Sequence, residues 1–79
     1  MLEGILVYNA KNDRYGLMVN GTWKKEGFHC GERLEVLCDG EWIRTRMEMD
    51  WTSKGCFWYL VDTEFYGKLD MLIARIYNV

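Results

Sequence analysis

A chain of 79 residues without an internal change in composition predicts one small domain spanning residues 1–79. Its 49% hydrophobic and 15% aromatic content excludes a disordered tail and predicts a packed core. Ten basic against twelve acidic residues give a net charge of −2, so the molecule as a whole carries no field that would attract nucleic acid or an anionic membrane.

The sequence shows no targeting or membrane signal. Met1–Gly4 contains no basic region before an apolar run, and no apolar segment approaches the ~18–20 residues that a membrane-spanning helix needs. The three cysteines are an odd number without a CxxC pair, which argues against a disulfide framework. We therefore predict a cytoplasmic protein with reduced thiols and no membrane partner.

The first two predicted strands form a hairpin. Gly4–Tyr8 is a short apolar run rich in strand formers, and Tyr15–Val19 is the returning strand. Between them, Asn9–Asp13 favours a turn because asparagine and aspartate side chains bond to their own backbone.

The next stretch has two interpretations. Asn20-Gly21 is a turn signal, and a tight turn there makes Thr22–Lys25 a short third strand. However, four of the eight glycines lie between Gly16 and Gly31, and this density favours an irregular loop over residues 20–32. We predict the loop, with the strand as the alternative.

The central element is a hairpin around Asp39-Gly40, a pair that suits a type I′ turn because both of its central positions need a positive φ. The strands are predicted at Leu34–Cys38 and Glu41–Met49. Side chains of a strand alternate between its faces, which makes one face of the second strand apolar. The other face carries an aromatic residue and four charges: Trp42, Arg44, Arg46, Glu48 and Asp50.

Cys56–Val61 is predicted as a further strand, reached through a polar turn at Trp51–Gly55. Aromatic and β-branched residues dominate it and fit a pleated surface. Because both of its faces are apolar, the strand is either central in a sandwich or barrel, or presents one face for contact with a partner.

The C-terminal stretch is ambiguous. Its apolar residues from Phe65 to Ile76 fit a helical stripe, whereas Gly67 and the β-rich ending oppose a helix. We predict a short helical turn over Thr63–Lys68 and a last strand over Asp70–Tyr77. The alternative is an α+β protein with a C-terminal helix.

Short strands with turn signals every eight to twelve residues predict an all-β fold. Closing the sheet on itself removes its edges and provides a shared interior, which favours a small SH3-like barrel of five or six strands. An OB-like barrel is the alternative.

The chemistry-bearing residues show no catalytic or metal-binding pattern. Glu48 and Asp50 on one strand are more typical of a solvated row of ion pairs than of an acid–base pair. His29 and the cysteines lack the paired spacing of zinc ligands. We therefore expect no catalytic residues, no metal or other cofactor, and no small-molecule substrate.

Surface recognition is the remaining possibility. The mixed-charge face of the central hairpin and the surplus of aromatic residues predict a protein interface or a self-association surface. Basic residues beside tryptophan also suit single-stranded nucleic acid, which is the second hypothesis. The candidate binding residues are Trp42, Arg44, Arg46, Glu48, Trp23, Lys24, Lys25 and Trp58.

Several short segments resemble a bacterial family catalogued as Domain of Unknown Function 5348. The segments that carry the resemblance are Phe28–Glu32, Leu34–Val36, Asp39–Trp42, Thr45–Met49, Trp58–Leu60 and Ala74–Ile76. The resemblance covers most of the chain from Tyr15 onward. It implies a short protein of Gram-positive bacteria, often encoded near mobile genetic elements, and it supplies no catalytic residues.

The sequence thus predicts a non-enzymatic binding module. The resemblance implies an accessory factor of a mobile element, acting as a regulator or inhibitor of a host system through a protein partner. A small nucleic-acid-binding β-barrel is the alternative.

Overall fold

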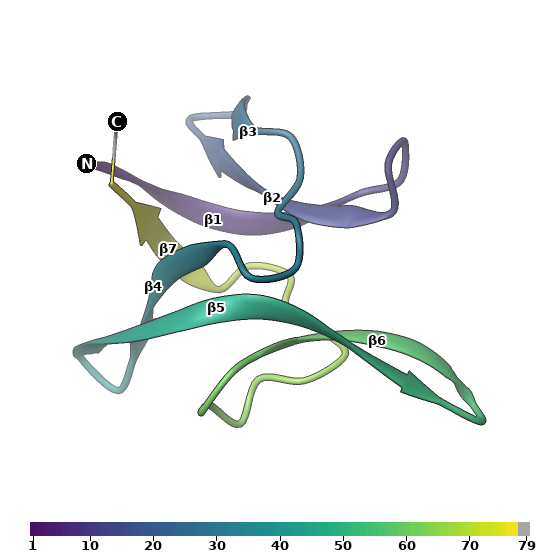
Figure 1. The fold of residues 1–79 in the computed structure, drawn as a ribbon. Coiled ribbons are helices and arrows are strands. Elements are labelled where there is room, and N and C mark those ends of the chain that lie inside the picture. The colour runs from purple at the N-terminus through teal and green to yellow at the C-terminus, as the bar shows by residue number, and fades with distance from the viewer. Residues whose placement is uncertain (78–79) are drawn as a thin grey trace.

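The computed structural model describes residues 1–77 and shows one antiparallel sheet of seven strands (Figure 1). The strands are β1 (Leu2–Asn9), β2 (Arg14–Val19), β3 (Thr22–Lys25), β4 (Arg33–Cys38), β5 (Glu41–Thr52), β6 (Gly55–Leu60) and β7 (Ile73–Ile76). Their order across the sheet is β3-β2-β1-β7-β4-β5-β6. The last strand, β7, therefore joins the N-terminal strands to the central hairpin.

Two tight turns determine the local pairing. At Asp39-Gly40 the φ angles are 51° and 81°, and at Asn20-Gly21 they are 51° and 77°. Both pairs thus have the positive φ values of a type I′ turn, whose twist matches that of the strands it joins. The first turn confirms the predicted central hairpin. The second shows that the loop predicted over residues 20–32 is wrong at its start, where β3 forms instead.

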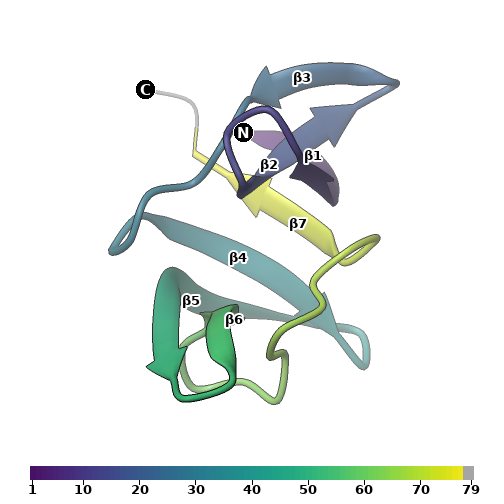
Figure 2. The same ribbon diagram turned by 90° about the vertical axis from the view of Figure 1, so that its right-hand side faces the viewer.

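The long strand β5 makes the sheet curl. Its first half pairs with β4 from Glu41 to Arg46, and its second half pairs with β6 from Met47 to Thr52. One strand thus forms hydrogen bonds with β4 along its first half and with β6 along its second half. In Figure 2 the β5–β6 hairpin turns away from the plane of β4 and β7.

The core lies between the β1–β2 hairpin and the β5–β6 hairpin. Its largest fully buried side chains come from seven different parts of the chain: Phe28, Leu6, Leu17, Met47, Leu60, Leu69 and Val36. Met47 points inward from β5 and Leu60 is its partner on β6. Five of these seven residues are inward-facing strand positions, which is the pattern that the sequence predicts for half-buried strands. Phe28 and Leu69 enter the core from the segments between strands.

Two polar contacts join parts of the sheet that are not paired as strands. The indole Nε1–H of Trp58 on β6 donates to the Asp13 carbonyl in the β1–β2 turn, at 3.0 Å. The Tyr15 hydroxyl on β2 accepts from the Leu69 backbone N–H and donates to Asp70, each at 3.2 Å. The segment between β6 and β7 is thereby held against the N-terminal hairpin.

The all-β class is confirmed, with seven strands in place of the five or six predicted. The sheet does not close: within the described chain, β3 and β6 remain its edges. Residues 1–77 contain no helix, so neither the helical turn predicted over Thr63–Lys68 nor the alternative C-terminal helix is present. That segment instead bonds to the free edge of β6, where Leu60 N–H donates to Phe65 and Gly67 N–H donates to Trp58.

The part of the chain that the structure describes includes no helix that is long and apolar enough to cross a bilayer.

The packing of β2 against the chain after β3 generates a prediction. A Cβ atom on Gly16 would lie 2.3 Å from the Lys25 carbonyl oxygen, so the backbone there must move to accept a side chain. We expect Gly16→Ala to lower the free energy of unfolding by about 1–3 kcal/mol, as other insertions into a packed interior do. Urea denaturation measures this change, and an unchanged midpoint would contradict the close approach.

Candidate functional site

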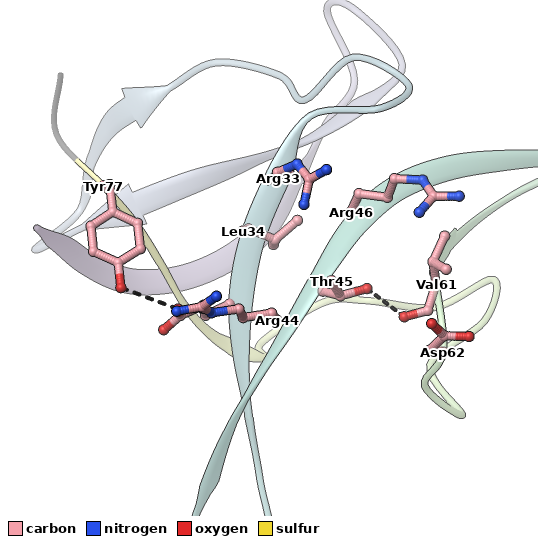
Figure 3. A pocket seen from close by; sticks show the side chains of 9 residues that line it. Arg33, Leu34, Arg44, Thr45, Arg46, Val61, Asp62 and Tyr77 are labelled. Atoms are coloured by element: carbon pink, nitrogen blue, oxygen red, sulfur yellow. Dashed lines mark hydrogen bonds and ion pairs between the residues drawn. The ribbon is translucent and has the colours of Figure 1, made fainter.

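The main candidate site is a groove on the outer face of β4 and β5, which we call the arginine groove (Figure 3). Its volume is about 450 Å³. It is lined by Arg33, Leu34, Glu35, Arg44, Thr45, Arg46, Val61, Asp62 and Tyr77. Three arginines, Arg33, Arg44 and Arg46, thus line one depression on the surface.

The register of the central hairpin brings these arginines together. Arg33 on β4 lies directly opposite Arg46 on β5, and Glu35 lies opposite Arg44. Opposed like charges on a sheet are destabilising, by amounts of about 0.2–1 kcal/mol. Glu48 partly offsets this repulsion, because its Oε2 atom lies 2.9 Å from the Arg46 Nε atom. Arg33 is exposed and makes no ion pair within residues 1–77.

Glu35 is the buried carboxylate beside this groove, and it organises the neighbouring cations. Its Oε1 atom accepts a 2.6 Å hydrogen bond from Arg75, and its Oε2 atom accepts one of 3.3 Å from Tyr77. The Arg44 Nε atom is 3.7 Å from Glu35, but the Arg44 side chain is 89% exposed. Arg75 is therefore the tight partner of Glu35, and Arg44 remains available at the surface.

The same contacts set the protonation of Glu35. The hydrogen bond from Arg75 holds the pKa of the Glu35 carboxyl below its ordinary value. Tyr77 and Arg44 act in the same direction, against the opposing effect of burial.

Trp42 lies next to the groove but does not line it. Its ring is half-buried, and the Arg75 guanidinium carbon lies 4.0 Å from the ring centroid. This geometry is a cation–π contact. Trp42 therefore helps to position Arg75, which in turn holds Glu35.

The second predicted cluster, Trp23, Lys24 and Lys25, lies on β3 at one edge of the sheet. Four strands lie between β3 and β5 in the sheet order. The Lys25 Nζ atom is already bound to Glu32 Oε2 at 2.6 Å, and Trp23 is half-buried. Only Lys24 of these three is exposed.

Two other predicted residues have structural contacts. Trp58 is 8% exposed and belongs to the core. Because its indole N–H is buried, it needs a hydrogen-bond acceptor, and the Asp13 carbonyl oxygen provides one. Glu48 forms its ion pair with Arg46, whereas the nearby Asp50 accepts a 2.6 Å hydrogen bond from Tyr66. The two carboxylates on β5 thus have different partners.

The thiols do not form a metal site in the described part of the chain. No group of three or more His, Cys, Asp or Glu side chains in residues 1–77 could hold a metal ion. Cys30 and Cys56 are exposed and Cys38 is half-buried, and all three are free. Burial raises the pKa of the Cys38 thiol, and the neighbouring acids add to that effect, which disfavours the nucleophilic thiolate.

The predicted site omitted several residues that line the groove: Arg33, Glu35, Asp62 and Tyr77. Arg33 could have been found from the sequence. A two-residue turn at Asp39-Gly40 pairs Cys38 with Glu41, and counting outward along both strands leads to Arg33 opposite Arg46. Asp62 and Tyr77 come from distant parts of the chain, and no local signal places them there.

The ion pair of Glu35 predicts how stability depends on pH. A carboxylate with a depressed pKa stabilises the fold above its unfolded pKa of about 4.3, and this contribution is lost as pH falls through the lower folded value. Glu35→Gln should therefore flatten the loss of stability below about pH 4.3. Urea midpoints between neutral and strongly acidic pH measure it.

Glu41→Gln is the matched control, because Glu41 is exposed and makes no ion pair within residues 1–77. In this variant, the urea midpoint should fall at acidic pH as steeply as it does in the wild-type protein. If the urea midpoints of wild type and Glu35→Gln fell equally steeply at acidic pH, the assigned role of Glu35 would be contradicted.

Comparison with known proteins identifies a family but no activity. A family model described as "Domain of unknown function (DUF5348)" matches residues 4–76. No curated protein and no solved structure matches the chain. The match covers nearly all of the described residues and agrees with the resemblance noted in the sequence. The chain therefore belongs to the Domain of unknown function (DUF5348) family.

Proposed function

We propose that this chain is a non-enzymatic binding module whose arginine groove holds an acidic segment of a partner protein. The observation that carries the proposal is the pairing of Arg33 with Arg46 on adjacent strands. A fold that only needed stability would not place two cations opposite each other. Such local conflicts are typical of functional sites.

The geometry of the groove suits carboxylate groups. Guanidinium groups are planar and can bind a carboxylate through two parallel hydrogen bonds. Arg33 and Arg44 are exposed, and Arg46 is 49% exposed, so all three can reach a ligand. An anion between Arg33 and Arg46 would relieve the repulsion between them. Binding and relief of local strain therefore act together.

The balance of charge favours a protein partner over nucleic acid. Glu35 and Asp62 line the same groove, and Glu48 pairs with Arg46. A continuous run of phosphates would meet these carboxylates, whereas one or two acidic side chains of a peptide can contact the arginines without meeting them. The net charge of −2 also opposes a polyanion at long range. The tight partners of Lys25 and Arg75 reduce the remaining basic surface.

The proposed cellular role follows from the family resemblance. The family resemblance supports an accessory factor of a bacterial mobile element, acting in the cytoplasm as a regulator or inhibitor of a host system. The tight hairpins and the strand shared by two ladders support a relationship to small SH3-like barrels, in a form whose sheet is open.

A peptide titration tests the groove. We expect a peptide with two adjacent glutamates to shift the backbone amide signals of β4 and β5 in NMR spectra, while its glutamine counterpart does not. Arg33→Gln/Arg46→Gln should weaken binding about tenfold or more, because a hydrogen bond to a charged group contributes about 1.5–3 kcal/mol. Lys24→Gln/Lys54→Gln removes the same charge elsewhere and should bind as the wild type does.

The nucleic-acid alternative is tested in the same series with a ten-nucleotide oligothymidylate. At 0.15 M salt we expect no binding of this probe. Oligonucleotide binding that weakens steeply with salt, together with no response to the glutamate peptide, would replace the proposal with the nucleic-acid alternative.

A further inference from the structure

A second groove lies between the β1–β2 hairpin and β6, away from the arginine groove; we call it the tyrosine groove. It is a shallow depression of about 750 Å³. Its side chains are four aromatic rings and two charged groups: Tyr8, Tyr15, Phe57, Tyr66, Lys68 and Asp70. Tyr8 and Tyr15 come from β1 and β2, Phe57 comes from β6, and the other lining residues come from the segment between β6 and β7.

The rings form two packed pairs. Phe57 stacks on Tyr66 with centroids 5.6 Å apart, and Tyr8 meets Tyr15 edge-to-face at 5.5 Å. Tyr8 is 40% exposed and Tyr66 is 50% exposed. Aromatic surface thus remains open to solvent on both sides of the groove. These rings are held by their neighbours, so little side-chain entropy is lost when a ligand binds.

Each tyrosine hydroxyl of this groove donates a hydrogen bond to a different carboxylate. Tyr8 donates to Asp13, Tyr15 donates to Asp70 at 3.2 Å, and Tyr66 donates to Asp50 at 2.6 Å. The carboxylates raise the pKa of Tyr8 and of Tyr66 through these bonds, so both phenols stay neutral. Three carboxylates are therefore fixed at the hydroxyl ends of these rings.

We propose that the tyrosine groove binds an arginine or lysine side chain from a basic segment of a partner protein. A cation over an aromatic face is attracted by the ring quadrupole, and nearby carboxylates strengthen the attraction. Among the described residues, Lys68 and Asp70 are the two charged ones that line the groove. Two further carboxylates, Asp13 and Asp50, do not line it but accept hydrogen bonds from the hydroxyls of its rings Tyr8 and Tyr66. The groove is therefore complementary to positive charge.

This site is independent of the arginine groove, and it has the opposite charge preference. On β5, Arg44 and Arg46 line the arginine groove, whereas Asp50 accepts a hydrogen bond from Tyr66 of the tyrosine groove. One partner with an acidic and a basic segment could occupy both grooves. Each groove can still be tested without the other.

The probe is a blocked pentapeptide with two arginines separated by glycine, followed by amide and side-chain NMR signals. We expect shifts at Tyr8, Phe57 and Tyr66, and none with the glutamine counterpart. Asp50→Asn/Asp70→Asn keeps one acceptor oxygen in each side chain and removes two charges, and it should weaken binding about three- to tenfold. Asp39→Asn/Glu41→Gln removes two charges at the β4–β5 turn and should leave binding unchanged.

Two further variants complete the test. Tyr66→Leu should weaken binding by a similar factor, and the unchanged dispersion of its amide signals shows that it is folded. Arg33→Gln/Arg46→Gln should bind the arginine peptide as the wild type does, which separates this site from the arginine groove. Equal affinity of wild type and Asp50→Asn/Asp70→Asn would overturn the proposal. Concentration-dependent dimerisation that Tyr66→Leu abolishes would also overturn it, because a second copy would then be the occupant.

Discussion

The double pairing of β5 is the constraint on which the rest of the structure depends. Its first six residues bond to β4 and its last six bond to β6. The sheet must therefore curl, and the curl brings Met47 and Leu60 under the β1–β2 hairpin. A chain of 79 residues buries a limited share of its surface. A single strand that contributes side chains to both halves of the core lets so short a chain form one continuous apolar interior. The Trp58 indole then fastens β6 to the Asp13 carbonyl across the open side.

The same strand distributes charge over the outer surface. Alternation sends Arg44 and Arg46 outward where β5 pairs with β4, and sends Asp50 outward where it pairs with β6. The residues that surround each end of β5 then determine the local charge. Arg33 adds a cation beside Arg46, whereas the rings of β6 and the following segment surround Asp50. A molecule with little net charge in this way carries cationic and anionic side chains at different ends of one strand.

Local chemistry was sufficient to predict part of this arrangement. The Asp39-Gly40 turn and the alternation of β5 follow from φ requirements and strand geometry, and both are confirmed. The strand β3 corresponds to the alternative interpretation of residues 22–25: the type I′ signal of Asn20-Gly21 determines the structure there, and the density of glycines does not. The helical turn expected near residues 63–68 is replaced by contacts to the β6 edge, which only the tertiary structure provides. The Arg33–Arg46 pair follows from the register of the β4–β5 hairpin, but the other sides of the grooves come from residues far apart in sequence, which local patterns do not locate.

The most direct test of the central claim is a double-mutant cycle on Arg33 and Arg46, measured by urea denaturation of the unliganded protein. If these side chains are opposed without a ligand, the cycle should give a repulsive coupling of about 0.2–1 kcal/mol. The coupling should shrink as salt is added, because both groups are exposed to solvent. Additive effects of the two substitutions, or an attractive coupling, would contradict the account.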